Sequence, residues 1–222
     1  MSNMKVQIVV RLALAAPILG AIFFWPAGTF DYWEAWVYLA ILFGAILGIT
    51  GYFLRRDPDL LVRRLEKRER ETAQQWIVGL SAVYFLLAYL LPGFDQRYGW
   101  SDAPEWLVLV GDAIVVLGFV FLFQVFKANS YASRVVVVEE GQEVISTGPY
   151  ARVRHPMYVS VLLVYVFSPL ALGSYWAMIP TVALIVLLVA RIRNEEQVLL
   201  RDLKGYGEYM EKVRWRLLPG IW

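Results

Sequence analysis

Long apolar runs separated by short polar connections dominate this chain. Five such runs cover residues 6–25, 35–54, 76–91, 106–126 and 157–190. The fifth is too long for one membrane crossing, because a span needs about 20 apolar residues. Pro169 and a turn at residues 172–174 divide it into a helical hairpin. The pattern predicts an all-α integral membrane protein with five to six transmembrane helices, ending in a C-terminal helical hairpin.

The basic residues lie mainly on one side of these runs. Residues 55–70 contain seven arginine and lysine residues, whereas the connection between the third and fourth runs contains only Arg97. Loops rich in lysine and arginine stay in the cytoplasm. We therefore expect residues 55–70, both termini and the polar C-terminal region to be cytoplasmic.

Composition supports a membrane protein and excludes several classes of site. Hydrophobic residues make up 59% of the chain, and the mean hydropathy is +0.53. With no cysteine and one histidine, thiolate chemistry and a histidine-based metal cluster are excluded, and we expect no metal. A net charge of +2 gives no reason to expect a nucleic acid partner. The small size of the polar parts is typical of a prokaryotic inner or plasma membrane protein.

The two parts of the chain differ in character. Residues 1–127 are expected to be the N-terminal transmembrane helices, and residues 128–222 carry most of the unusual polar chemistry, within one membrane domain. Residues 134–145 contain β-branched residues on both sides of a turn-like sequence, which predicts a short β-hairpin. Beyond the helical hairpin, leucine spacing predicts that the helix continues out of the membrane to about residue 203, and Gly205 ends it.

Two polar segments flank the predicted helical hairpin. Residues 148–158 contain two arginines, the only histidine, two prolines and two tyrosines, and residues 191–196 follow the second arm. Arg191 and Glu195 are four residues apart and therefore share one helix face. Both segments are expected at the same interface, which predicts a cytoplasmic pocket for a small molecule.

The side chains of these segments indicate the kind of ligand. Arginine binds carboxylates, glutamate binds ammonium or ribose hydroxyl groups, and aromatic rings attract a cation such as a sulfonium. A nucleoside that carries an amino acid fits this inventory, as do many other zwitterions. His155 is either a hydrogen-bonding residue at a helix end or a general base. The chain has no glycine-rich phosphate loop, so a nucleoside would not be bound in the usual α/β manner.

An ordered set of motifs runs through the C-terminal part. The chain contains Gly-x-Tyr at residues 148–150, Arg-His-Pro-x-Tyr at residues 154–158 and Arg-x-x-x-Glu-Glu at residues 191–196. These motifs are followed by Tyr-x-x-Tyr at residues 206–209 and a basic tail with proline at residues 216–219. This combination resembles the isoprenylcysteine carboxyl methyltransferase family and the related phospholipid methyltransferases. These integral-membrane enzymes use S-adenosylmethionine, and the resemblance covers residues 128–219.

The resemblance implies roles for individual residues. It implies cofactor contacts at Gln142, Val144, Ile145, Tyr150, His155, Pro156, Tyr158, Glu195 and Glu196. The two adjacent glutamates could exchange their roles with a small shift of the helix. Arg191 resembles the residue that faces the acceptor's carboxylate, and Arg154 is a second candidate for binding an anion. These two arginines are the catalytic candidates.

The resemblance also implies a reaction. The acceptor would attack the methyl group of S-adenosylmethionine in line, and S-adenosylhomocysteine would leave. The acceptor is expected to be a lipophilic small molecule or lipidated molecule from the bilayer, with a carboxylate as the methylated group. The alternatives are a phospholipid amine, a small thiol, an NADPH-dependent reductase, and a membrane binding or assembly protein without catalytic activity.

Overall fold

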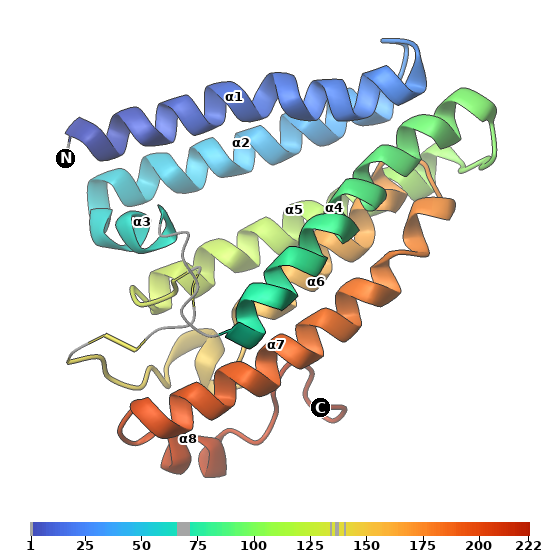
Figure 1. Cartoon of the computed structure of the whole chain (residues 1–222). Coiled ribbons are helices and arrows are strands. Elements are labelled where there is room, and N and C mark those ends of the chain that lie inside the picture. Colours follow the sequence, from blue (N-terminus) through green and yellow to red (C-terminus); the bar gives the residue numbers. More distant parts are fainter. Residues whose placement is uncertain (1, 66–71, 134, 136–137, 140) are drawn as a thin grey trace.

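The protein is described by a computed structural model that covers residues 2–65, 72–133, 135, 138–139 and 141–222. The chain folds, in order, into α1 (Ser2–Ala27), α2 (Trp33–Arg56), α3 (Pro58–Leu65), α4 (Thr72–Tyr98), α5 (Glu105–Ala128), η1 (Gly148–Ala151), α6 (Pro156–Ala171), η2 (Trp176–Met178), α7 (Thr181–Asp202) and α8 (Tyr206–Lys212) (Figure 1). The elements η1 and η2 are short 3-10 helices.

Five segments are long and apolar enough to cross a membrane. They are Lys5–Ala27, Trp33–Arg56, Gln74–Tyr98, Glu105–Ala128 and Trp176–Asp202. The shorter apolar helix α6 lies between the last two of them in sequence. The predicted all-α architecture is confirmed for the described residues, with five candidate membrane spans where five to six were expected. Helix α6 ends at Ala171, and α7 begins at Thr181, so the chain breaks where the turn residues indicated.

Close packing of two helices forms the centre of the bundle. Gly111 and Gly118 lie on the face of α5 that meets α6. A Cβ atom at Gly118 would lie 2.8 Å from Val164 Cγ2, and one at Gly111 would lie 2.7 Å from the backbone nitrogen of Ala171. Glycine is therefore required for this approach, as at many interfaces between membrane helices. The contact fixes α6, which has His155 as its N-cap and Tyr158 in its first turn.

Buried polar contacts join the helices at other levels of the bundle. Asp95 near the end of α4 accepts hydrogen bonds from the backbone nitrogen and the hydroxyl of Ser101, each at 2.7 Å, and from the hydroxyl of Ser174. Within the bundle, the Tyr38 hydroxyl lies 2.6 Å from the Ser168 hydroxyl. Satisfied buried networks of this kind hold helices in one arrangement, and here they hold α6 and its connection to α7.

The predicted β-hairpin is wrong for the described residues. Residues 135, 138–139 and 141–147 contain no strand, and residues 134, 136, 137 and 140 lie outside the described part of the chain. The Glu139 nitrogen donates to the side chain of Gln142, and the Gln142 nitrogen donates to the Glu139 carbonyl. Val138 and Val144 pack against a cluster that contains Leu203. Val138 and Val144 thus pack beside the end of α7 instead of pairing in strands.

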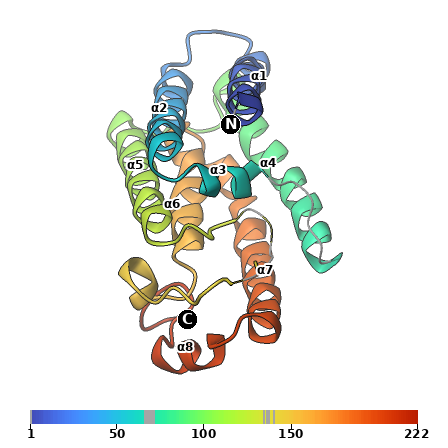
Figure 2. The same cartoon turned by 90° about the vertical axis from the view of Figure 1, so that its left-hand side faces the viewer.

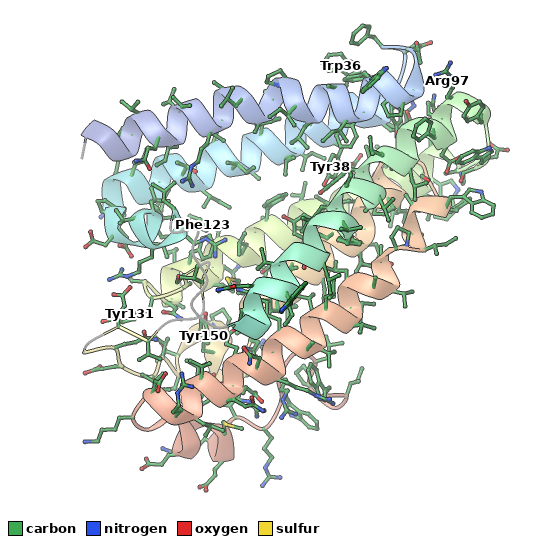
Figure 3. All side chains as sticks on the ribbon, viewed as in Figure 1. Trp36, Tyr38, Arg97, Phe123, Tyr131 and Tyr150 are labelled. Carbon is green, nitrogen blue, oxygen red and sulfur yellow. The ribbon has the colours of Figure 1, made fainter. Side chains whose placement is uncertain are left out.

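The polar segments gather at one end of the bundle. Figures 1 and 2 show α8, η1 and the C-terminus at the same end as α3. The side chain of Arg63 in α3 donates to Glu139 at 2.6 Å, which places the basic segment beside the C-terminal polar region. Trp36 and Arg97 lie at the opposite end from Tyr131 and Tyr150 (Figure 3). Which end faces the cytoplasm stays a prediction.

Candidate active site

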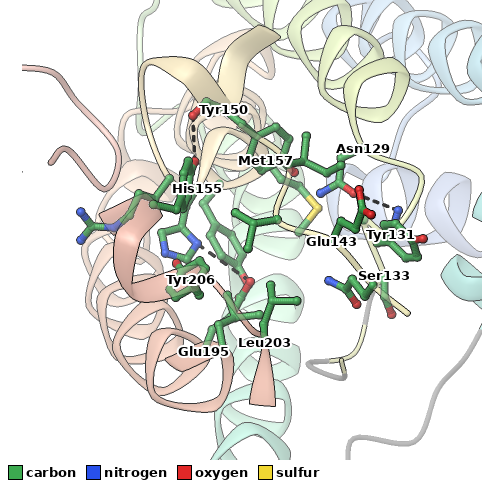
Figure 4. A pocket seen from close by; sticks show the side chains of 18 of the residues that line it. Asn129, Tyr131, Ser133, Glu143, Tyr150, His155, Met157, Glu195, Leu203 and Tyr206 are labelled. Carbon is green, nitrogen blue, oxygen red and sulfur yellow. Dashed lines mark hydrogen bonds and ion pairs between the residues drawn. The ribbon is translucent and has the colours of Figure 1, made fainter. Parts of the chain in front are cut away.

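A cavity lies between the α7–α8 region and the segments on both sides of η1. Its empty volume is about 780 Å³, which includes the part open to solvent. Its lining residues are Asn129, Tyr131, Ala132, Ser133, Val135, Gln142, Glu143, Val144, Ile145, Tyr150, Arg154, His155, Met157, Tyr158, Glu195, Leu199, Leu203, Tyr206 and Tyr209. Figure 4 shows Tyr150, His155 and Tyr206 on one side of this cavity, with Tyr131, Ser133 and Glu143 on the other.

The hydroxyl of Tyr158 joins the two segments that the sequence singled out. It donates to Glu195 Oε2 at 2.5 Å and accepts a hydrogen bond from Arg191 Nε at 2.9 Å. Pro156 begins α6, because its missing N–H is tolerated in a first helical turn. Tyr158 follows in that turn and is buried. Arg191 and Glu195 share a face of α7, as their spacing indicated, and the hydroxyl of Tyr158 lies between them.

His155 lies between the two adjacent glutamates. Its Nε2 atom is 3.2 Å from Glu196 Oε1, and its Nδ1 atom is 3.9 Å from Glu195 Oε1. The imidazole is buried, and its ring centre is 5.8 Å from that of Tyr158. His155, at the start of α6, and Glu195, in α7, therefore line the same cavity, as the sequence predicted.

Glu196 has a different environment from Glu195. Its Oε1 atom accepts from Arg154 Nε at 2.7 Å and contacts His155, and its Oε2 atom accepts from Arg216 Nε at 2.8 Å. The side chain of Glu196 is 5% exposed, whereas that of Glu195 is 20% exposed. Of the two glutamates, Glu195 faces the cavity, and Glu196 holds the chain segments around it.

The C-terminal segment completes this arrangement. The backbone nitrogens of Arg154 and His155 donate to the carbonyls of Trp215 and Arg216, both at 2.9 Å. The guanidinium of Arg154 also donates to the carbonyls of Val213 and Arg214, each at 2.8 Å. The backbone and the side chain of Arg154 together attach the C-terminal segment to the cavity wall. The basic tail is recognisable as a motif in the sequence, but no individual role was predicted for Arg216.

Three tyrosines line the cavity, Tyr150 from η1 and Tyr206 and Tyr209 from α8. The Tyr209 hydroxyl donates to the Tyr150 carbonyl at 2.8 Å. Within the described part of the chain, the buried hydroxyl of Tyr206 has no hydrogen-bond partner. Burial raises the pKa of Tyr150 to about 12, and burial also raises the pKa of Tyr206 and Tyr209. All three therefore keep their protons at neutral pH, and the Tyr206 hydroxyl, which has no partner among the described residues, can donate to a ligand.

The cavity brings together most of the residues that the sequence analysis named. Those that line it are Gln142, Val144, Ile145, Tyr150, Arg154, His155, Tyr158 and Glu195. Pro156, Arg191 and Glu196 lie next to it and are not among its described lining residues. Tyr206, Tyr209 and Leu203 also line the cavity and had no predicted role, although the tyrosines form a Tyr-x-x-Tyr motif and Leu203 follows the helical leucine spacing.

A second cavity adjoins the first at the level of the apolar helices. Its empty volume is about 1150 Å³, including the part open to the surroundings. Its lining residues come from α3 to α7 and are Arg64, Val78, Ser81, Ala82, Phe85, Phe119, Leu122, Met157, Tyr158, Ser160, Val161, Val164, Tyr165, Leu184, Leu188 and Arg191. Met157 and Tyr158 line both cavities. The two spaces therefore share a wall in the first turn of α6.

Comparisons with known proteins agree with this arrangement. Residues 106–207 match the family described as phospholipid methyltransferase. The fold is similar to that of the eukaryotic intramembrane Ras methyltransferase ICMT, isoprenylcysteine carboxyl methyltransferase, with a TM-score of 0.51 and 17% sequence identity over 98% of this chain and 86% of that chain. The family match and the fold indicate a membrane methyltransferase. A search of curated proteins found no significant match.

The resemblance inferred from the sequence motifs is thus confirmed. The matched region begins in α5 and ends just after Tyr206, so it contains His155, Glu195 and most of the first cavity. Residues 213–216, which bind Arg154, lie beyond the matched region. Their place in the site follows from the structure.

Proposed function

We propose that the protein transfers the methyl group of S-adenosylmethionine to a lipophilic acceptor, and that the methylated group is a carboxylate. One observation carries this proposal: a polar cavity and a mainly apolar cavity share Met157 and Tyr158 as a common wall. A water-soluble methyl donor and a membrane-derived acceptor need two environments that meet at one point. The proposal places the donor in the first cavity and the acceptor in the second.

The residues of the first cavity fit S-adenosylmethionine. The carboxylates of Glu143 and Glu195 suit the ammonium or ribose hydroxyl groups, and aromatic rings suit a sulfonium cation. The buried Tyr206 hydroxyl, unpaired among the described residues, offers a further polar contact. Val144 and Ile145 add apolar surface for an adenine ring. The bound cofactor would supply an electrophilic methyl group, and the chain would supply position and surroundings.

The protein's own residues would act mainly through orientation. Tyr158 and Glu195 hold each other, and Arg191 is fixed against the same hydroxyl at the entrance of the apolar cavity. A guanidinium there binds a carboxylate and keeps it beside the shared wall. An ionised carboxylate is already a nucleophile, so no strong base is required, and good orientation alone gives effective molarities of about 10⁵–10⁸ M. His155 and Arg154, both bonded to Glu196, position the cavity wall.

A second acceptor class is favoured by the family match. The matched family is described as phospholipid methyltransferase, and N-methylation of a phospholipid amine would use the same two cavities. Both versions place the cofactor cavity on the cytoplasmic side of a prokaryotic inner or plasma membrane. Both also take the lipophilic acceptor sideways from the bilayer.

The test uses purified protein in phosphatidylcholine nanodiscs. We expect S-adenosylmethionine to bind in calorimetric titration, and we expect labelled methyl groups to pass to a membrane lipid extract. Alkali should release the label from the product as methanol, because methyl esters are hydrolysed whereas N-methyl groups are stable. Arg191→Ala should keep cofactor affinity within about twofold and lower transfer at least about tenfold, as expected for loss of a charge-assisted contact.

The other outcomes separate the alternatives. Label that resists alkali on a phospholipid would assign the amine as the acceptor. Binding of NADPH in place of S-adenosylmethionine would indicate a reductase. A folded protein that binds neither compound would contradict the enzymatic proposal and favour a binding or assembly role.

A further inference from the structure

Two tyrosines of α8 share one face of the helix and differ in the bonding of their hydroxyl groups. Tyr206 and Tyr209 are three residues apart, which places them on the same side of α8. Both are buried, with 4% and 5% exposure, and both line the first cavity, which is the proposed cofactor cavity. The Tyr209 hydroxyl donates to the Tyr150 carbonyl at 2.8 Å, whereas the Tyr206 hydroxyl has no partner among the residues that the structure describes.

A buried hydroxyl group without a bond needs an explanation. A buried polar group that bonds neither protein nor water costs free energy, and most such groups in native proteins have a partner. The ring of Tyr206 packs in an apolar cluster that contains Leu203 and Val213. Phenylalanine would fill the same space in that cluster without the cost of the hydroxyl. A partner supplied from the cavity, by water or by a bound ligand, therefore explains the hydroxyl best.

The surroundings of this hydroxyl indicate the chemistry of its partner. Burial raises the pKa of Tyr206, and the negative charges of Glu196 and Glu195 raise it further. The hydroxyl therefore keeps its proton at neutral pH and can donate a hydrogen bond. Glu196 is bonded to Arg154 and Arg216, whereas Glu195 faces the cavity. A hydroxyl donor and a carboxylate acceptor thus lie on the same side of the cavity (Figure 4).

A donor beside an acceptor fits two neighbouring hydroxyl groups. Glu195 Oε2 accepts from Tyr158, and Glu195 Oε1 lies 3.9 Å from His155 Nδ1, which is longer than a hydrogen bond. Carboxylate oxygens accept several hydrogen bonds, so Glu195 can accept one more from a ligand. The ribose of a nucleoside is neutral, whereas the carboxylate of a methionine group would be repelled by Glu195 and Glu196. The charges on this side of the cavity therefore favour a ribose.

We propose that Tyr206 and Glu195 together bind the ribose diol of S-adenosylmethionine, with Tyr206 donating to one hydroxyl and Glu195 accepting from the other. The inference rests on the proposed function and adds a specificity-determining residue from α8. It also separates the roles of the two tyrosines. Tyr206 binds the ligand, whereas Tyr209 attaches α8 to η1 through the carbonyl of Tyr150.

The experiment removes the same atom from each tyrosine. Tyr206→Phe and Tyr209→Phe are compared with the wild type in phosphatidylcholine nanodiscs, by thermal unfolding without ligand and by calorimetric titration of S-adenosylhomocysteine. Tyr206→Phe should keep Tm or raise it by about 2–4 °C, because an unpaired hydroxyl is lost, and should weaken binding about fivefold to tenfold. Tyr209→Phe should lower Tm by at least about 2 °C, because the Tyr150 carbonyl loses its donor.

Two analogues of S-adenosylhomocysteine, which lack the 2′ or the 3′ hydroxyl, test the ribose assignment. The wild type should bind each analogue at least about fivefold more weakly than the full compound. Tyr206→Phe should bind one analogue as tightly as the full compound, because the hydroxyl missing from that analogue is the one that Tyr206 contacts.

Two results would overturn the inference and leave the proposed function intact. One is unchanged affinity of a folded Tyr206→Phe protein for S-adenosylhomocysteine, which is expected if only water pairs with the hydroxyl. The other is a full further loss for both analogues in Tyr206→Phe, which would place this hydroxyl away from the ribose. A folded wild-type protein that binds neither S-adenosylmethionine nor S-adenosylhomocysteine would instead overturn the proposed function, and this inference with it.

Discussion

The two adjacent glutamates of α7 should respond differently to the same small change. Replacing either one by glutamine removes one negative charge and keeps the shape of the side chain. Glu196 holds Arg154, His155 and Arg216 through three contacts of 2.7–3.2 Å. Glu195 accepts a hydrogen bond from Tyr158, lies 3.9 Å from His155 Nδ1 and faces the cofactor cavity. We therefore expect Glu196→Gln to reduce stability and Glu195→Gln to reduce cofactor affinity.

The magnitudes follow from burial. The side chains of Glu196, Arg154 and His155 are 5%, 4% and 3% exposed. Removing one charge from such a buried group leaves its partners uncompensated and costs about 3–5 kcal/mol. For a chain of this size, that corresponds to a decrease in Tm of about 6–20 °C. Glutamine at position 195 still accepts from Tyr158, so the cost there should be less than about 1 kcal/mol.

Thermal unfolding followed by tryptophan fluorescence, together with calorimetric titration of S-adenosylmethionine, measures both effects on the same samples. Glu195→Gln should weaken cofactor binding at least about tenfold, which is the loss of one charge-assisted contact, while Tm stays within about 3 °C of the wild type. Equal decreases in Tm for the two variants would refute the division of roles. So would a Glu196→Gln protein with wild-type stability.

Two further predictions test the packing and the topology. Gly118→Ala should destabilise the protein by about 1–3 kcal/mol, because the new methyl group would overlap with Val164. Gly44 has open space around its Cβ position, so Gly44→Ala should be neutral or slightly stabilising. Thermal unfolding of the two variants distinguishes these outcomes. A single cysteine introduced at the exposed position Lys212 should react with a membrane-impermeant maleimide only from the cytoplasmic side. A single cysteine at the exposed position Asp102 should react from the outer side. Labelling of position 212 in intact cells would contradict the proposed orientation.

The membrane helices were predictable because their signal is local. Each apolar run is long enough to be recognised alone, and the break between α6 and α7 follows from a turn sequence at residues 172–174. The position of Arg191 and Glu195 on one face of α7 also follows from their spacing of four residues. Such features need no knowledge of distant contacts.

The predicted β-hairpin failed for the opposite reason. The branched side chains near Val135 and Val144 fit a strand, but a strand also needs a partner, and that depends on tertiary context. Val144 instead packs on Leu203 and lines the cofactor cavity. A row of β-branched residues indicates apolar contact, and the sequence alone does not say which surface receives it.

The division of roles between Glu195 and Glu196 was likewise hidden from the sequence. Adjacent residues on a helix point about 100° apart, since one turn takes 3.6 residues. The side on which the cofactor cavity lies depends on where Arg154 and Arg216 approach α7, and both belong to other segments. The motif identified the pair of carboxylates, and the tertiary contacts distinguish them.

Tyr158 explains why the proposed site needs both polar segments. Its hydroxyl bonds at once to Glu195, which faces the first cavity, and to Arg191, which lines the second. The two charged side chains are four residues apart on one helix, so a phenol from α6 fixes both in a single contact. A shift of α6 along α5 would move this hydroxyl away from both charges together. The glycine contacts between α5 and α6 therefore set the distance between the proposed cofactor and acceptor sites, and one of them, between Gly118 and Val164, lies at the second cavity.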